Sequence, residues 1–508
     1  MQRRKSYLPG FILYILVIFF IIFDFQFEDY IQREPQSIHH WRQSDGASIA
    51  LNYYHYGMEF FKPETHFQCA DVNTSGYGVG EFPIVYYASA ALYKLFGPKT
   101  YIIRVLHVLI FLIGLFHLYK GLRERYKDRF WALFIPIMLS ASPVILYYAT
   151  NYLPDTAALG LVLIAWYHIS NYDLHKRTND IWKIAFFFCL AGLLKITALL
   201  SFIPIFGLAI LSLFPISKWK FFHHPIKASL AFLAVLIVNL GWYKWAIAYN
   251  ALHRTPYFST HTWPYNSLDE ETIANVWDKI INKWGPDYFY PDTYVFFILL
   301  ILIFLWNVRR MKAFWNYMMG SLLIGTIVFG YLFFLNLMNH DYYTINLYIF
   351  PVLLMVALVD LFHKKKIRFA PSWLIKILLT VFAYYNIEYG NEILQERYTG
   401  WVNDMRIYQK MDGIKPYLKS LGISREDRFL IVGDPTPNTA LYRIDQKGWT
   451  DLLMHSHKDD MLQELFGKGF SYMVILNEAA LEERPFLKKY TTKTIGEFNG
   501  LAIYDVRR

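Results

Sequence analysis

Cysteine is nearly absent from this chain. Only Cys69 and Cys189 occur among 508 residues. One lies in a polar stretch and the other in an apolar segment, so a disulfide framework is excluded. The N-terminus begins with "MQRRK" and continues into an apolar run, but it lacks a small-residue cleavage site. This pattern predicts a membrane anchor rather than a removed signal peptide.

Apolar residues are abundant instead. The chain is 55% hydrophobic and 19% aromatic, with a mean hydropathy of +0.23. Soluble proteins contain about 45–50% apolar residues, so the composition predicts a membrane protein. The net charge of +10 comes from short basic runs between apolar segments, such as "KGLRERYKDR" and "HKKKIR". Such runs are typical of cytoplasmic loops, so they indicate topology and not a nucleic-acid partner.

The apolar segments predict a mainly α-helical, polytopic membrane protein with about eleven spans. They lie near 8–23, 101–119, 130–148, 156–171, 181–191, 195–214, 227–247, 293–308, 313–334, 346–362 and 372–388. With a cytoplasmic N-terminus, the alternation places every basic run in the cytoplasm. We therefore expect a multi-pass protein of the cytoplasmic (inner) membrane.

The same threading places a long first loop (24–100) and the stretches 148–155, 248–292 and 336–344 outside. Within the first loop, "QSDGASIALNYYHYG" has helical spacing from Asp45 and stops at Gly57. "EFPIVYYASAALYKLFG" runs in the same way from Pro83 to Gly97. Both segments are rich in Tyr and too short to span, which predicts two helices along the outer interface.

The C-terminal region predicts a small soluble α/β domain outside the membrane. "RFLIVGD" and "SYMVILN" are typical of buried strands, and "DDMLQELFGKGF" of an amphipathic helix. Asn499-Gly500 between two alternating runs predicts a hairpin. "VGDPTPN" has no dinucleotide-binding or P-loop pattern, so no cofactor is assigned to this domain. We expect a transmembrane module over 1–389 and this domain over 390–508.

Polar groups at the outer ends of the apolar segments are the functional candidates. They are Arg42, Asp45, Glu81, Asp155, Lys195, Arg254, His261, His340, Asp341, Tyr342 and Tyr343. An ionisable side chain near membrane depth is costly and is therefore a functional candidate by default.

Each candidate also has a purely structural interpretation. The acids Asp45, Glu81 and Asp155 could serve as helix N-terminal acids, and Lys195 could extend to an interface. The remaining groups could be surface or packing histidines (His39, His40), an aromatic belt (Tyr342, Tyr343) or a solvated loop (Arg254, His253, His261).

The order of these motifs resembles a known superfamily. "WRQSD" in a large first external loop, "EFP", "PD", "GLLK" and "HDYY…P" follow one another. The order is similar to the C-type (GT-C fold) glycosyltransferases, in the branch of protein O-mannosyltransferases and aminoarabinose-lipid A transferases. The resemblance covers about residues 8–360. It implies a polyprenyl-phosphate sugar donor and an active site on the outer side of the membrane.

The resemblance also implies roles for single residues. Asp45 matches the first-loop acid that acts as base or orients the acceptor, and Asp155 matches a second acid of the same cavity. Glu81 matches an acidic position that in some members contributes to a divalent metal site, with His261 as a candidate co-ligand. Lys195 matches the lysine that contacts the donor phosphate, and Tyr342-Tyr343 resembles a turn that closes over the donor. Many mannosyltransferases have a paired Asp-Glu where this chain has Asp45-Gly46.

The residue types fit the transfer of a sugar from a lipid phosphate even without the family resemblance. Displacing a lipid phosphate from an anomeric carbon requires a base near the acceptor hydroxyl and cations near the leaving phosphate. A carboxylate base contributes about 10²–10⁴-fold. Lys195, Arg42 and Arg254 are the candidate cations, which act most strongly where the dielectric is low. A single displacement predicts inversion, with a lipid, glycan or protein hydroxyl as acceptor.

Two other functions stay open at this point. An O-antigen or surface-polysaccharide polymerase or ligase also handles lipid-linked sugars, but typically has its chemistry in a large late loop. A lipid-linked sugar transporter predicts paired repeats with broken helices at mid-membrane, a pattern not evident in this sequence. Acids concentrated in the first external loop favour the glycosyltransferase.

Overall fold

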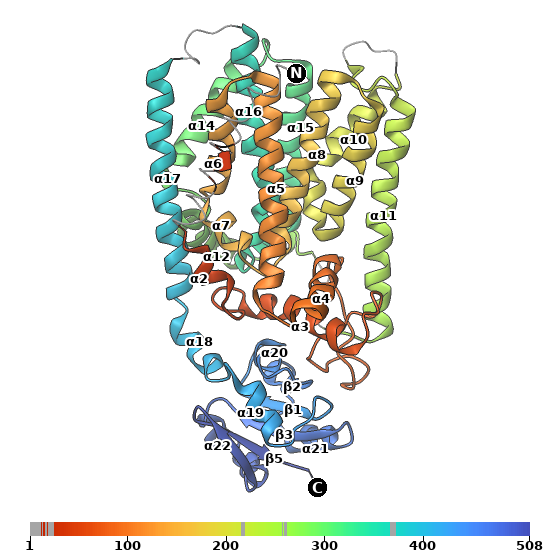
Figure 1. The fold of residues 1–508 in the computed structure, drawn as a ribbon, viewed down its shortest axis with the longest axis vertical. Helices are drawn as coiled ribbons and strands as arrows, with labels where there is room; N and C mark the ends of the chain where they lie inside the picture. Colours follow the sequence, from red (N-terminus) through yellow and green to blue (C-terminus); the bar gives the residue numbers. More distant parts are fainter. Residues whose placement is uncertain are drawn as a thin grey trace. The chain divides into compact units, whose positions relative to one another are not determined.

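The computed structural model describes residues 12, 14, 15, 18, 25–214, 219–256, 258, 262–365 and 372–507 (Figure 1). The chain forms two compact units. Unit 1 comprises Met1–Tyr30, His107–Trp242 and His261–Gln395; unit 2 comprises Ile31–Leu106, Tyr243–Thr260 and Glu396–Arg508. The predicted anchor at 8–23 lies largely outside the described residues, and so does His261.

Long helices follow the apolar segments of the sequence. They are α5 (Tyr101–Tyr126), α6 (Arg129–Ser140), α7 (Pro143–Ala149), α8 (Asp155–His175), α9 (Thr178–Leu194), α10 (Phe202–Leu211), α11 (Pro225–Leu252), α14 (Pro291–Trp306), α15 (Ala313–Leu332), α16 (Ile349–Lys365) and α17 (Trp373–Thr399). In the described part of the chain, four helices are long and apolar enough to cross a membrane. The number rises to six if two bent pairs each count as one span: Arg129–Ser140 with Pro143–Ala149, and Glu270–Tyr288 with Pro291–Trp306. A polytopic helical protein is confirmed, and the count of eleven is not.

Unit 1 is built on the close packing of α5, α8 and α9. A Cβ on Gly114 of α5 would lie 2.4 Å from the carbonyl oxygen of Gly160 on α8. Glycine therefore lets the two backbones approach, as small residues do in membrane helix pairs. Lys176 (φ 54°) caps α8, and the chain returns along it as α9.

The chain breaks at Lys195, which separates two apolar segments that almost merge in the sequence. Lys195 is extended (φ −154°, ψ 117°), and the 3₁₀ turn η1 (Ile196–Ser201) follows it and leads into α10. A second 3₁₀ segment, η6 (Asp341–Tyr348), packs against η1 and against α8. The two turns therefore bring the segments "GLLK" and "HDYY" together in unit 1.

Unit 2 contains the two helices predicted in the first loop. Helix α4 (Ile84–Phe96) lies between Pro83 and Gly97, as predicted. Helix α3 (His40–Tyr56) ends at Gly57 in the left-handed conformation (φ 109°), also as predicted. Its start was predicted wrongly: α3 begins at His40, not at Asp45. The left-handed His39 (φ 56°) reverses the chain there without a side-chain cap, and sequence gives no signal for that.

The C-terminal region forms the predicted α/β domain. Its sheet has the order β2-β1-β3-β5-β4. Strand β1 (Arg428–Val432) is parallel to β2 (Gly448–Thr450) and β3 (Phe470–Ile475), whereas β5 (Leu501–Asp505) is antiparallel to β3 and β4 (Thr494–Phe498). Asn499 and Gly500 have positive φ (49° and 76°) and form the predicted hairpin turn. The shorter helices are α2 (Phe27–Ile31), α12 (Glu270–Asp278), α13 (Gly285–Tyr288), α18 (Val402–Gln409), α19 (Ile414–Ser420), α20 (Thr439–Ile444), α21 (Asp459–Phe466) and α22 (Ala479–Glu483).

The first loop is part of this domain's core. Phe67 and Cys69 are buried in the same apolar cluster as Phe429 and Ile431 of β1. Backbone hydrogen bonds join the loop to β2: Gln68 N–H donates to Gly448 O (2.7 Å), and Gly448 N–H donates to His66 O (3.0 Å). The loop therefore covers part of the β2 edge, which would otherwise expose backbone groups. The division at 389/390 stays a prediction.

Candidate functional site

The predicted site residues are divided between the two units. Unit 1 holds Asp155, Lys195, His340, Asp341, Tyr342 and Tyr343, and unit 2 holds Arg42, Asp45, Glu81 and Arg254. The groups in each unit are described separately.

In unit 1, Lys195 and Asp155 form a buried ion pair. Lys195 Nζ lies 3.3 Å from Asp155 Oδ1, and their side chains are 9% and 1% exposed. Asp155 is the first residue of α8, where the helix dipole favours an acid. The ammonium group of Lys195 points into the unit, so this lysine does not extend to an interface. Because a buried charge is costly unless it is paired, the arrangement needs both residues.

Two tyrosines complete what we call the Lys195 cluster (Asp155, Lys195, Tyr342 and Tyr343). Lys195 Nζ lies 5.1 Å from the ring centroid of Tyr342 and 4.7 Å from that of Tyr343, within the range of cation–π attraction. The ring of His340 stacks on Tyr343 at 5.0 Å. Tyr342 is only 2% exposed, so it packs inside unit 1 and is not a residue of an outward-facing aromatic belt.

Asp341 is a further buried acid beside this cluster. It is 0% exposed, and its Oδ1 accepts a 2.6 Å hydrogen bond from the hydroxyl of Tyr148. The ring of Tyr148 lies 5.5 Å from that of Tyr342. Asp341 thus adds a second buried carboxyl group beside the Lys195 cluster.

In unit 2, Asp45 is held by partners distant in sequence. It lies in the second turn of α3 and is 0% exposed, so it is not a helix cap. The side-chain amide of Asn438 donates a 2.7 Å hydrogen bond to Asp45 Oδ1. Arg42 Nη1 lies 3.6 Å from Asp45 Oδ2. Both contacts stabilise the ionised carboxylate.

Arg42 also binds Glu81, which precedes α4. Arg42 Nη2 donates to Glu81 Oε2, and the two side chains are 13% and 15% exposed. Glu81 lies two residues before the N-cap Pro83, so it is not a first-turn acid of α4. One guanidinium thus bridges two carboxylates. We call Arg42, Asp45, Glu81 and Asn438 the Asp45 cluster.

The residues beside Asp45 on α3 also contact the C-terminal domain. His40 Nδ1 and Ser44 Oγ lie 3.1 Å and 3.5 Å from Thr439 Oγ1. His39 and His40 are 7% and 9% exposed, so both are packing residues. Burial, together with the charges of Arg443 and His39, lowers the pKa of His40 to about 4. The neutral imidazole therefore packs at this junction at ordinary pH.

A third arrangement in unit 2 was not anticipated from the sequence. Asp445 Oδ2 and Oδ1 lie 3.2 Å from His55 Nε2 and His66 Nε2, and Arg425 Nη2 donates to Oδ2 at 2.8 Å. Burial raises the pKa of Asp445. Its hydrogen bonds with His55 and His66 lower that pKa by a larger amount, so the net shift is strongly downward. Nothing local in the sequence marks Asn438 or Asp445, because their partners lie in the first loop.

Arg254 is not brought to either cluster by any contact among the described residues. It is exposed in the turn after α11 and has a left-handed backbone (φ 51°). Its neighbour His253 pairs with Asp71 (3.0 Å between Nδ1 and Oδ2). The phosphate role of Arg254 stays a prediction.

The metal site that the resemblance implied stays a prediction, and the contacts of Glu81 are the observation that bears on it. A metal would have to displace the guanidinium of Arg42 from Glu81. Across the described ranges, His, Cys, Asp and Glu side chains do not gather in threes in a way that could hold a metal ion. His261, the predicted co-ligand, lies outside the residues described. No catalytic step is therefore derived through a metal.

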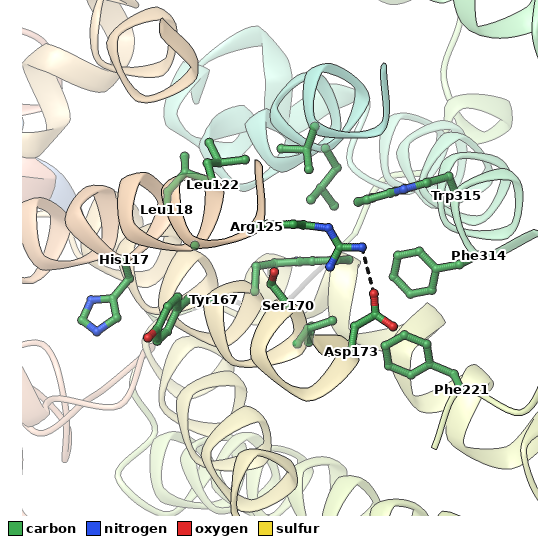
Figure 2. A pocket seen from close by; sticks show the side chains of 15 residues that line it. His117, Leu118, Leu122, Arg125, Tyr167, Ser170, Asp173, Phe221, Phe314 and Trp315 are labelled. Carbon is green, nitrogen blue, oxygen red and sulfur yellow. Dashed lines mark hydrogen bonds and ion pairs between the residues drawn. The ribbon is translucent and has the colours of Figure 1, made fainter. Parts of the chain in front are cut away.

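A small cavity of about 60 Å³ lies near the far end of α8 in unit 1 (Figure 2). Figure 2 shows Arg125 pointing to Asp173, with the rings of Phe221, Phe314 and Trp315 around the pair; Arg125 Nη2 lies 2.8 Å from Asp173 Oδ2. The cavity has room for only a few water molecules. It is too small for a sugar, so it is not a candidate substrate site.

Known proteins share this architecture. A family model described as dolichyl-phosphate-mannose-protein mannosyltransferase matches residues 81–242. No curated protein sequence matches the chain. The structure of ArnT from Cupriavidus metallidurans bound to undecaprenyl phosphate is similar over 97% of each chain, with a TM-score of 0.60 and 11% identity.

Two further solved structures are similar. The oligosaccharyltransferase of Archaeoglobus fulgidus in complex with Zn and sulfate has a TM-score of 0.51 and 13% identity, covering 94% of this chain and 72% of that one. The arabinofuranosyltransferase AftD from Mycobacteria has a TM-score of 0.52 and 12% identity, covering 96% of this chain and 41% of that one. All three are GT-C fold glycosyltransferases. The GT-C fold expected from the sequence is therefore confirmed.

Proposed function

We propose that this chain, which its fold and family match indicate to be a membrane glycosyltransferase, transfers a sugar from a polyprenyl-phosphate donor to an acceptor hydroxyl. The donor class is supported by one similar structure and by the matching family model. ArnT was solved with undecaprenyl phosphate bound, and the matching family is named for a dolichyl-phosphate sugar. The acceptor is a lipid, glycan or protein hydroxyl at the outer face of the cytoplasmic membrane, the side that the basic runs assign to the first loop.

The observation that carries this proposal is the Lys195 cluster. A buried lysine has few structural uses, and this one lies between Asp155 and two tyrosines at the start of α8. An ammonium group has three N–H donors, so Lys195 can keep its ion pair with Asp155 and donate to a phosphate oxygen as well. In a site of low dielectric, this contact stabilises the charge that develops on the leaving phosphate.

Arg42 and Arg254, both in unit 2, remain candidate cations for the donor phosphate, as the sequence predicts. The two terminal nitrogens of Arg42 lie near Asp45 and Glu81, so a phosphate would share this guanidinium with the two acids. A guanidinium binds carboxylate and phosphate oxygens with the same planar geometry. Arg254 is exposed and so is open to a ligand. Tyr342 and Tyr343 provide the ring surface of the donor pocket.

Asp45 is the proposed general base. The acceptor O–H gives its proton to the carboxylate while the oxygen attacks the anomeric carbon. The bond between that carbon and the phosphate oxygen breaks, and polyprenyl phosphate leaves with its electron pair. This single displacement inverts the anomeric centre. The hydrogen bond from Asn438 and the nearby Arg42 favour the ionised, oriented carboxylate that the step requires.

Mass spectrometry of surface glycans, membrane lipids and lipid-linked sugars tests this proposal in cells. The variants are Asp45→Asn and Lys195→Ala, and the matched control is Glu59→Gln, at a 57% exposed acid of unit 2. Both site variants should remove one sugar modification and accumulate its polyprenyl-phosphate donor, while the control should not. If both variants reach normal protein levels and leave every glycan and glycolipid unchanged, the proposal fails.

A further inference from the structure

A basic pocket lies at the end of unit 1 where α5 meets α6. Lys127, in the left-handed conformation (φ 55°), ends α5, and Asp128 caps α6 by accepting from Phe130 N–H at 2.8 Å. This two-residue turn places cationic side chains around an open pocket of about 600 Å³. The pocket is lined by Arg123, Tyr126, Lys127, Asp128, Arg129, Phe130, His363 and Lys376.

The charges of this pocket are not balanced. Four of its lining residues are Arg or Lys, and one is an acid. That acid, Asp128, forms an ion pair with Lys376, and Lys376 Nζ lies 3.1 Å from Asp128 Oδ2. Within the described ranges, no ion pair neutralises Arg123, Lys127 or Arg129. The pocket therefore presents three uncompensated cations to a ligand, which indicates an anion.

The position of the pocket across the thickness of the membrane indicates that its ligand is a lipid. Helix α5 has 26 residues and so is about 39 Å long, whereas the hydrocarbon core of a bilayer is about 30 Å thick. Its last, charged turn therefore extends into the headgroup layer. Tyr126 and Phe130 line the pocket beside the cations, and aromatic rings are favoured at that level. A soluble anion would not require this placement.

This pocket is separate from the Lys195 cluster. Arg125, in the last turn of α5, pairs with Asp173 near the end of α8 (2.8 Å), whereas Asp155 begins α8. Helix α8 has 21 residues, so about 30 Å separates its two ends. The pocket and the cluster thus lie at opposite ends of α8, and a donor bound at Lys195 does not account for the cations at Arg123, Lys127 and Arg129.

We infer that this pocket binds the phosphate headgroup of an anionic phospholipid, in the leaflet opposite the Lys195 cluster. The phosphate contacts Lys127 and Arg129, which are exposed, and Arg123, which is half-buried. Basic pockets between membrane helices are known to hold such headgroups. A bound lipid would tie the α5–α6 turn to α17, which contributes Lys376. This inference does not depend on the proposed catalytic function.

Native mass spectrometry of the full chain measures the binding. The probes are phosphatidylglycerol and phosphatidylcholine, with Lys127→Gln/Arg129→Gln as the test variant. The control is Arg177→Gln/Lys183→Gln, which removes two exposed cations around the start of α9 and changes the net charge equally. Each cation near an anionic lipid contributes about fivefold in affinity. We expect wild type and control to retain phosphatidylglycerol over phosphatidylcholine, and the test variant to bind it about 25-fold more weakly.

Three outcomes would overturn the inference. The first is equal retention of the two lipids by wild type, and the second is a loss of phosphatidylglycerol by the control pair as strong as the loss by the test pair. In a third arm, millimolar inorganic phosphate is added to the wild-type sample. If phosphate displaces the lipid completely, the site recognises a free phosphate, and the assignment to a lipid is wrong. Thermal unfolding of each variant confirms that the chain is folded when binding is measured.

Discussion

The side-chain amide of Asn438 donates a 2.7 Å hydrogen bond to the carboxylate of Asp45, although 393 positions separate the two residues. The contact joins the loop after β1 in the C-terminal domain to helix α3 of the first loop. Asn438 is itself fixed, because its Oδ1 accepts from the backbone N–H of Phe67 at 3.0 Å. The C-terminal domain thus has a direct part in orienting the proposed base.

Replacing Asn438 should therefore slow the transfer. In Asn438→Ala, Asp45 keeps Arg42 but loses its oriented hydrogen bond, so we expect the turnover rate to fall about tenfold, part of the 10²–10⁴ that a positioned base contributes. The KM for the lipid donor should change little, because the donor contacts are assigned to other residues. Steady-state kinetics on purified protein separate the two quantities.

A control distinguishes positioning from folding in this case. Thr439→Val removes the neighbouring hydroxyl that contacts His40 and Ser44, but leaves the bond between Asn438 and Asp45. It should keep most of the activity. Equal losses of activity and melting temperature in both variants would assign Asn438 a purely structural role.

The pair of Lys195 and Asp155 should be strongly coupled in stability. Lys195→Met leaves a buried carboxylate without its cation, which costs about 3–5 kcal/mol when the pair is fully enclosed. Asp155→Leu/Lys195→Met removes both charges and should recover most of that loss. Thermal unfolding in detergent measures the coupling between the two positions.

The same double variant also separates stability from function. It should be as inactive as Lys195→Met, because the proposed phosphate contact is missing in both. A double variant as unstable as the single one would argue against the buried ion pair. A stable and fully active double variant would remove Lys195 from the donor site.

Acid should loosen the junction between the first loop and β2. Burial lowers the pKa of His66, and the Asp445 carboxylate offsets this only in part; burial likewise lowers the pKa of His40. In the unfolded chain both imidazoles have a pKa of about 6.5, whereas in the folded chain their pKa values are lower. The stability that depends on keeping these two histidines neutral is therefore complete above about pH 6.5 and is lost as the pH falls below that value.

Hydrogen exchange of the amides at 66–68 and 448–450, corrected for the intrinsic rate, tests this expectation. Protection should fall at least about tenfold between pH 7.5 and 5.5. His40→Asn/His66→Asn should be less protected at pH 7.5 but should show a much smaller change with pH. Protection that is independent of pH in the wild type would contradict the assignment.

Chelation should leave the enzyme active. Because the Arg42 guanidinium holds Glu81, the carboxylate already has its cation, and we expect EDTA to change the rate less than twofold. Glu81→Gln should lower the rate about tenfold, since Arg42 would then be held by Asp45 alone. Loss of activity on chelation, with recovery on adding a divalent ion, would restore the metal hypothesis.

The helices and strands could largely be predicted from the sequence. Long apolar runs, Gly57 and Gly97 as helix ends and the Asn499-Gly500 turn are local signals, and each has its predicted structure. The start of α3 could not be predicted, because the left-handed His39 depends on packing against the rest of unit 2. The number of spans also could not, because several helices are shorter or more bent than a single apolar span.

Part of the candidate site could likewise be predicted from the sequence, and part could not. The motifs marked Asp155, Lys195 and the tyrosine pair, and the structure brings these residues together in unit 1. The contact from Asn438 was missed because "VGDPTPN" carries no chemical signature of its own. Its meaning arises only from the long-range contact with Asp45, which no spacing in the sequence encodes.

The most direct test of the account is the release of undecaprenyl phosphate by the purified chain. The donors are undecaprenyl-phosphate hexoses and pentoses, and a membrane extract of the host supplies the acceptor. We predict release from at least one donor by wild type, and a rate lower by about 10²–10⁴-fold for Asp45→Asn at equal protein level and melting temperature. Release by Asp45→Asn at the wild-type rate would contradict the account, and so would no release by wild type from any donor.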